Sequence, residues 1–91
     1  MYEVSIKKKI LKNLNKLPFP IQQKLFILID DLHEKGPIRN DWPNYSKIDN
    51  NKYHCHLSYK WVACWTCEQN KLEIEVYYAG SREKAPYRNK N

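Results

Sequence analysis

The sequence predicts one α+β domain over residues 1–91, in which a short N-terminal strand and a two-helix hairpin pack on an antiparallel β-sheet. Three observations support this fold class. Apolar residues recur at helical spacing in the first half of the chain, they alternate with polar residues in the second half, and the elements follow the order β-α-α-β-β-β. With 42% hydrophobic residues, a chain of this length can bury a single core.

The first half of the chain combines a short strand with two helices. Residues 2–6 alternate apolar and polar side chains, as a strand with one buried face does. Apolar residues then recur at helical spacing over residues 6–17 and again over residues 21–32. Pro18 lies between the two runs, and Gly36 ends the second one. Because the connection is so short, the two helices are expected to form an antiparallel hairpin.

The second half is strand-like after an irregular segment. Residues 38–51 have no clear period and are rich in Asn, Asp and Pro, which indicates a loop or a short edge element. Three runs with strand character follow, over residues 52–58, 61–68 and 72–78, and short turns separate them. Such a meander has one buried face that can cover the helical hairpin.

Two histidines in the first of these runs are candidates for chemistry. Side chains alternate between the faces of a strand, so His54 and His56 are expected on one face, roughly 7 Å apart. Tyr53, Cys55 and Leu57 then face the core. Neutral imidazole accepts a proton near pH 7 and imidazolium returns one, which suits general acid–base catalysis.

Charge and cysteine content restrict the partners and the compartment. The net charge of +6 indicates a polyanionic or acidic partner. Three cysteines make an odd number without a regular spacing, and the chain has neither a signal-peptide pattern nor an apolar run of membrane-spanning length. These features predict a reduced cytoplasmic protein that does not contact a membrane.

A zinc site is the alternative interpretation of the histidines and cysteines. His54, Cys55 and His56 together with Cys64 and Cys67 offer five possible ligands. On strands, however, Cys55 points away from the two histidines, and Cys64 and Cys67 lie on opposite faces. We therefore expect no metal and no cofactor, and cysteines that pack as small apolar side chains.

Taken together, the element order and several segments resemble the RelE/HigB group of toxins from type II toxin–antitoxin systems, within the RelE/ParE superfamily. The resemblance covers nearly the whole chain. It is carried by Gly36-Pro37, Trp42-Pro43-Asn44-Tyr45-Ser46-Lys47-Ile48, Tyr53-His54-Cys55-His56-Leu57, Val62-Ala63-Cys64-Trp65, Glu75-Val76-Tyr77-Tyr78-Ala79-Gly80 and Arg82-Glu83-Lys84-Ala85-Pro86-Tyr87.

This resemblance implies a RelE-like fold and a metal-independent endoribonuclease that cuts mRNA, commonly in the ribosomal A site, and so inhibits translation. It also implies a cognate antitoxin protein that holds the toxin inactive. The toxin alone is expected to be monomeric, and its complex with the antitoxin is expected to be of higher order.

The resemblance also assigns roles to residues. It places His54 and His56 where these toxins handle protons, Arg82 where an arginine contacts the scissile phosphate, and Tyr87 where a tyrosine stacks on or orients the substrate. Many members carry a further arginine where this chain has residues 58–62.

Within residues 58–62 the sole cation is Lys60, which lacks arginine's two-pronged phosphate contact. Lys84 and Arg88 are expected to help bind phosphate. Lysines on the polar side of the first helix either form a solvated face or bind ribosomal RNA: Lys8, Lys9 and Lys12.

Two other functions fit parts of the pattern. A toxin like those of the ParE group would bind DNA gyrase and cut nothing, and a nucleic-acid-binding module would need only the positive charge. The joint presence of His54, His56, Arg82 and Tyr87 favours the nuclease, because a gyrase binder has no use for proton carriers beside a phosphate-binding arginine.

Overall fold

A computed structural model describes residues 1–68 and 70–89 of the chain, without the side chains of Arg88 and Asn89. The elements are, in order, β1 (Glu3–Ile6), α1 (Lys8–Lys12), the 3-10 helix η1 (Leu14–Lys16), α2 (Phe19–Lys35), β2 (Ser46–Asp49), β3 (Lys52–Ser58), β4 (Trp61–Cys67), β5 (Glu73–Ser81) and the 3-10 helix η2 (Pro86–Asn89).

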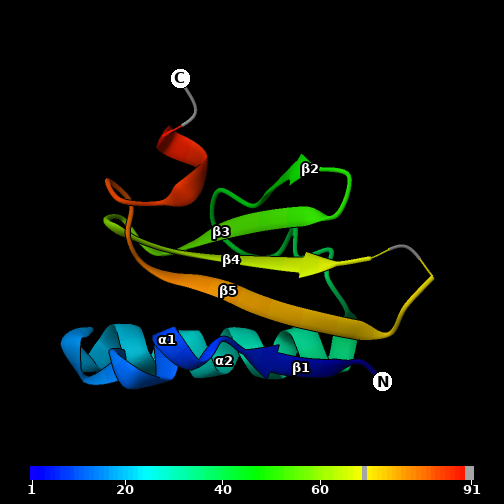
Figure 1. The fold of residues 1–91 in the computed structure, drawn as a ribbon, viewed down its shortest axis with the longest axis horizontal. Helices are drawn as coiled ribbons and strands as arrows, with labels where there is room; N and C mark the ends of the chain where they lie inside the picture. Colours follow the sequence, from blue (N-terminus) through cyan, green and yellow to red (C-terminus); the bar gives the residue numbers. More distant parts are fainter. Residues whose placement is uncertain (69, 90–91) are drawn as a thin grey trace.

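The molecule has two layers, a five-stranded sheet and the helices that cover one of its faces (Figure 1). The strand order is β1-β5-β4-β3-β2. Neighbouring strands are antiparallel except β1, which pairs in parallel with β5 and makes the sheet mixed. In Figure 1 η2 lies on the side of the sheet opposite α1 and α2. The predicted α+β architecture is confirmed, and β2 is the expected short edge element.

The first predicted helix is shorter than expected. Instead of a helix over residues 6–17, α1 ends at Lys12 and a 3-10 turn follows. The cause is Asn13, whose side-chain amide donates a hydrogen bond of 3.0 Å to the carbonyl oxygen of Lys9. Asparagine competes in this way with regular helical bonding. Ile10 and Leu17 are nevertheless buried, as the apolar spacing predicted.

The core lies between α2 and the sheet. Leu25, Leu28 and Leu32 of α2 are fully buried, and they belong to one apolar cluster with Trp65 of β4. The Trp65 indole N–H donates a hydrogen bond of 3.0 Å to the carbonyl oxygen of Pro37. The apolar spacing of α2 is therefore explained by its packing in this core. Among the described residues, none of the helices has the length and apolar character of a membrane span.

The last strand departs from simple alternation. Val76 lies opposite Trp65 and Tyr78 lies opposite Cys64, so Tyr77 is an extra residue that forms a β-bulge. The regular alternation expected of the 72–78 run therefore stops at Val76. Tyr78 lies outside the core cluster, and its hydroxyl donates a hydrogen bond of 2.7 Å to the carbonyl oxygen of Ser81.

The end of α2 depends on a glycine, and we expect Gly36→Ala to destabilise the fold. Gly36 has φ +93°, a conformation that L side chains rarely adopt, and an added Cβ would lie 2.8 Å from the Tyr2 ring. Strain of this kind costs about 1–3 kcal/mol. Urea unfolding should show a loss of that size. In a Tyr2→Ala background the steric part should disappear while the conformational part remains, and an unchanged midpoint in both backgrounds would contradict the assignment.

Candidate active site

His54 and His56 lie on the face of the sheet that the helices do not cover. Their neighbours Tyr53, Cys55 and Leu57 are buried in the helix-side core, so the alternation predicted from the sequence is confirmed. The two imidazole rings meet edge to face with centroids 5.9 Å apart. His54 is partly exposed, whereas His56 is only 8% exposed. The pair is close enough to act on one small group.

Contacts from the preceding segment hold both histidines. The hydroxyl of Ser46 shares a hydrogen bond of 2.9 Å with Nδ1 of His54, its partner across the β2–β3 ladder. The backbone N–H of His56 donates a bond of 2.8 Å to the carbonyl oxygen of Pro43. Sequence reasoning assigned no role to Ser46. It lies in the 42–48 segment that carries part of the resemblance, but only the register of the two strands brings it to the imidazole.

Tyr87 approaches the same pair from the C-terminal end of the chain. It belongs to η2, and its ring centroid is 4.4 Å from that of His54, with the two rings tilted by 52°. The structure thus joins residues more than thirty positions apart in the chain.

Arg82 follows β5 directly and is anchored by its backbone. Its N–H donates a hydrogen bond of 2.8 Å to the carbonyl oxygen of Lys60, and its guanidinium carbon lies 5.3 Å from the centre of the Tyr59 ring. The positive charge of Arg82 is also one of the causes that lower the pKa of His56, after burial.

The surroundings lower the pKa of both histidines below the usual 6.5. For His54 the main cause is burial, and the charge of His56 adds to it. For His56 the main cause is again burial, followed by the charge of Arg82. Both imidazoles are therefore predominantly neutral at pH 7, and a neutral imidazole is the form that accepts a proton.

This lowering predicts a stability that falls in acid. Unfolded histidine has a pKa of about 6.5, so just below that pH the unfolded chain binds more protons than the folded one. The contribution of His54 and His56 is complete above about pH 6.5 and is lost as the pH falls through their lowered pKa values. Urea unfolding from about pH 7.5 to about pH 5.5 should show this loss.

The double variant His54→Gln/His56→Gln should lose most of this pH dependence, while the matched variant His33→Gln, on α2, should keep it. A double variant whose stability follows pH as the wild type does would show that the two imidazoles do not carry the effect.

The cations expected to bind RNA or phosphate lie at different places. Lys60 is exposed in the turn between β3 and β4, beside the Arg82 backbone. Lys84 is exposed in the segment after β5, with its N–H 3.3 Å from the Ser81 hydroxyl. Arg88 belongs to η2, but its side chain lies outside the described part of the structure. On α1, in the helical layer and not on the histidine face, are Lys8, Lys9 and Lys12.

The cysteines lie on the two faces that strand alternation assigns to them. Cys55 and Cys67 are in the helix-side core, and Cys64 lies opposite Tyr78 outside that cluster. All three are buried free thiols. Burial raises the pKa of Cys55 and of Cys64 to about 12, so neither is a thiolate near neutral pH. Residues 1–68 and 70–89 contain no cluster of three or more His, Cys, Asp or Glu that could hold a metal ion.

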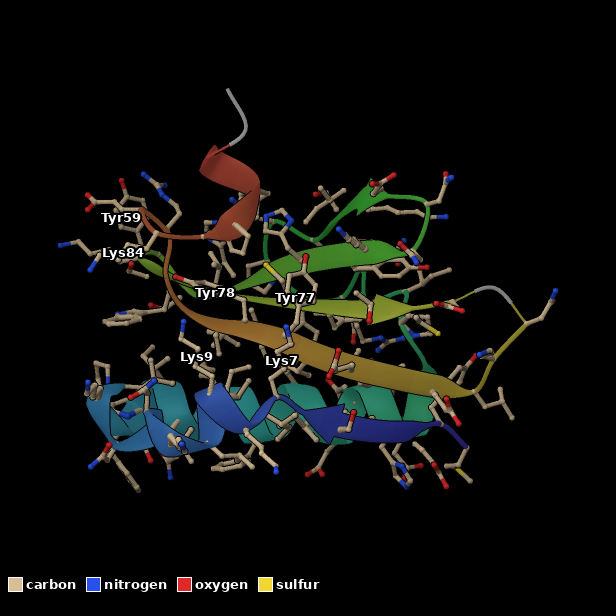
Figure 2. The ribbon with its side chains drawn as sticks, in the orientation of Figure 1. Lys7, Lys9, Tyr59, Tyr77, Tyr78 and Lys84 are labelled. Atoms are coloured by element: carbon tan, nitrogen blue, oxygen red, sulfur yellow. The ribbon has the colours of Figure 1, made fainter. Side chains whose placement is uncertain are left out.

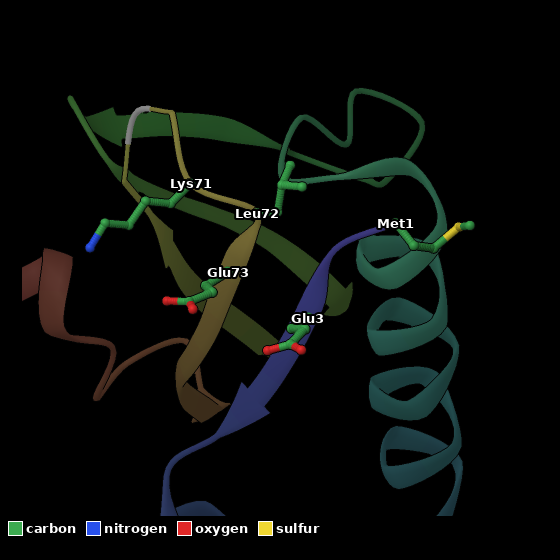
Figure 3. Close-up of a pocket in the computed structure, with 5 residues that line it drawn as sticks. All are labelled: Met1, Glu3, Lys71, Leu72 and Glu73. Carbon is green, nitrogen blue, oxygen red and sulfur yellow. The ribbon is translucent and has the colours of Figure 1, made fainter.

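A cavity of about 510 Å³ lies at the β1 edge of the sheet, where β1 meets β5 (Figure 3). Glu3 and Glu73 face each other there across the two strands, with Lys71 beside them. The strands β5 and β4 separate β1 from β3, so this cavity is remote from the histidines. It contains none of the residues singled out in the sequence.

No protein-family model and no curated protein sequence matches the chain. Solved structures do. The archaeal RelE–RelB complex from Pyrococcus horikoshii aligns with a TM-score of 0.72 at 18% identity, over 92% of this chain and 98% of that one. The isolated RelE toxin of E. coli aligns with a TM-score of 0.68 at 17% identity, over 94% and 89% of the two chains. The chain has the RelE-type toxin fold.

A third solved structure has the same fold. The YoeB–YefM complex from Staphylococcus aureus aligns with a TM-score of 0.66 at 10% identity, over 90% of this chain and 98% of that one. The suspected resemblance is thereby confirmed at the level of the fold. In this chain the RelE-type fold places β3 and the segment after β5 side by side, so His54, His56, Arg82 and Tyr87 share one region.

Proposed function

We propose that this chain is the toxin of a type II toxin–antitoxin system and that it cuts mRNA without a metal, on the ribosome. The observation that supports this best is the pair of imidazoles 5.9 Å apart on the sheet face that the helices do not cover, with the Tyr87 ring packed against His54. The positive charge of Arg82 is among the causes that lower the pKa of His56. Proton carriers, a cation and an aromatic platform are the groups that RNA cleavage by the 2′-OH requires.

In the proposed reaction one imidazole, in its neutral form, takes the proton of the 2′-OH. The 2′-oxygen then attacks the adjacent phosphorus, the bond from phosphorus to the 5′-oxygen breaks, and the second imidazole, in its protonated form, gives its proton to that oxygen. The products are a 2′,3′-cyclic phosphate and a 5′-OH end. Rings 5.9 Å apart can reach the two oxygens on opposite sides of one phosphodiester.

Arg82 stabilises the negative charge that develops on the phosphoryl oxygens. A guanidinium donates paired hydrogen bonds to phosphoryl oxygens, and it stabilises the transition state more than the substrate because negative charge increases there. The bound phosphate in turn raises the pKa of the neighbouring imidazole and favours the protonated form that the leaving oxygen needs. Tyr87 would hold the unstacked base.

A small antitoxin is the expected protein partner. Two of the similar structures are complexes, RelE with RelB from P. horikoshii and YoeB with YefM from S. aureus. Because this chain carries a net charge of +6, we propose an acidic antitoxin that covers the histidine face. Action on translated mRNA would place the toxin in the cytoplasm.

Mapping of mRNA 5′ ends after controlled expression tests the nuclease. Wild type should create new 5′ ends at in-frame codon positions, and Arg82→Ala should lower their number about 10²–10³-fold, the usual cost of removing one charge-stabilising donor. Lys24→Ala, an exposed lysine on α2, is the matched control and should cut like wild type.

Growth arrest that leaves mRNA intact and that Arg82→Ala does not change would contradict the proposed nuclease function. It would favour a toxin that binds DNA gyrase. Binding to RNA without any cleavage on ribosomes would instead favour a non-catalytic module.

A further inference from the structure

A second cavity lies between the helical layer and the C-terminal half of β5, and its volume of about 770 Å³ falls within the range of about 300–1,000 Å³ typical of ligand sites. It exists because β1 pairs with β5 only as far as Ile6 and Val76. Beyond that point the chain turns into α1, so the rest of β5 has α1 and η1 beside it in place of a strand. We call this cavity the α1–β5 groove.

The α1–β5 groove is positively charged without compensation. Lys7, Lys9, Lys16 and Lys84 line it, and none of its described lining residues is acidic. The ion pairs in the described part of the chain, Arg39–Asp41 and Lys71–Glu68, involve none of these lysines. Figure 2 shows Lys7, just before α1, and Lys9 of α1 directed toward β5. The occupant that such a surface attracts is polyanionic.

Aromatic rings accompany these charges. Trp61, Tyr77 and Tyr78 line the groove, and each is only partly buried. The β-bulge at Tyr77 places two successive tyrosines at this part of β5. Figure 2 shows both tyrosines on β5, the strand toward which Lys7 and Lys9 point. Lysines that track a backbone, combined with rings on which bases stack, are the usual components of a single-stranded nucleic-acid site.

The groove adjoins the histidine face through one short segment. This segment is residues 82–87. The charge of Arg82 is among the causes that lower the pKa of His56, and Lys84 and Pro86 line the groove. Tyr87, the next residue, packs on His54. An RNA strand that follows this segment away from the histidines would therefore reach Lys84 and Pro86 at the groove.

We propose that the α1–β5 groove binds the single-stranded RNA that flanks the cut, with lysines on its phosphates and aromatic rings on its bases. This inference rests on the proposed nuclease function and extends it: the chain grips more of the strand than the reacting nucleotides. An acidic protein segment could use the same charge, but it would gain little from three rings that suit base stacking.

The test compares a trinucleotide with a strand of about ten nucleotides, both made uncleavable by a 2′-deoxy sugar at the reacting position. Wild type should bind the longer strand several-fold more tightly, and Lys7→Gln/Lys16→Gln should lose that advantage. Because each phosphate contact on a single strand contributes about 0.7 to the salt slope, the slope of log K against log salt should fall by about 1.4. Lys24→Gln/Lys35→Gln removes the same number of charges from α2, and it should keep both the tighter binding of the longer strand and the wild-type salt slope.

Tryptophan fluorescence supplies a readout that does not depend on charge. The longer strand should quench wild type more than the trinucleotide does, and Trp61→Phe should remove that extra quenching. If Lys7→Gln/Lys16→Gln bound the longer strand as tightly as wild type does, while wild type cut translated mRNA, the groove would not be an RNA site. The proposed nuclease function would still stand.

A groove variant that loses affinity for a poly-glutamate peptide but not for RNA would overturn the groove as an RNA site and assign it to an acidic protein. A wild type that neither binds RNA nor cuts it would overturn the proposed function and this inference together.

Discussion

Replacement of His56 by alanine is expected to lower the rate of mRNA cleavage about 10²–10⁴-fold, the contribution usual for one general acid or base. His56 is the less exposed of the two imidazoles, at 8%, and the positive charge of Arg82 is among the causes that lower its pKa. The measurement is the single-turnover rate of cleavage on programmed ribosomes with purified wild type and variant.

The matched control is His33→Ala, which removes the imidazole on α2, in the helical layer. Its cleavage rate should equal that of wild type within the error of the assay. Far-UV circular dichroism of both variants establishes that they fold. A folded His56→Ala protein that cuts at the wild-type rate would remove this ring from the mechanism.

A second large effect is expected from Trp65→Ala, on stability. Trp65 is 0% exposed, it stacks with Tyr53 at a centroid distance of 6.1 Å, and its N–H bonds the Pro37 carbonyl oxygen. Truncation of a buried tryptophan costs about 3–5 kcal/mol, against a total stability of about 5–15 kcal/mol for a domain. Urea unfolding followed by far-UV circular dichroism should give a loss in that range.

Tyr59→Ala is the control for that experiment. Tyr59 is also aromatic, but it is 74% exposed, so its truncation should change the free energy of unfolding by no more than about 0.5 kcal/mol. A Trp65→Ala variant as stable as Tyr59→Ala would mean that the core tolerates the cavity and that the Trp65 stack does not stabilise the fold.

Sequence reasoning predicted the elements well where a period was long. The apolar run of α2 and the alternation of β3 follow from burial on one face, which requires the same spacing in any fold. It was wrong where the backbone departs locally from a regular period. Asn13 ended α1 early, and the bulge at Tyr77 moved Tyr78 out of the core pattern.

The candidate site divides in the same way. That His54 and His56 share a face follows from strand geometry alone, whereas Arg82 and Tyr87 were proposed through a family resemblance. The contact of Tyr87 with His54, the bond from Ser46 and the proximity of Arg82 to His56 depend on how distant segments pack. No pattern within one segment carries that information.

The sequence by itself determined the α+β class, the faces of β3 and the positive charge that indicates a polyanionic partner. Only the tertiary structure decided that β1 joins β5 in parallel, that the α1–β5 groove opens beyond Val76, and that one short segment connects this groove to the histidines. The reason is physical. Periodicity records which side of an element is buried, but strand order and the closing of loops depend on the packing of residues far apart in the chain.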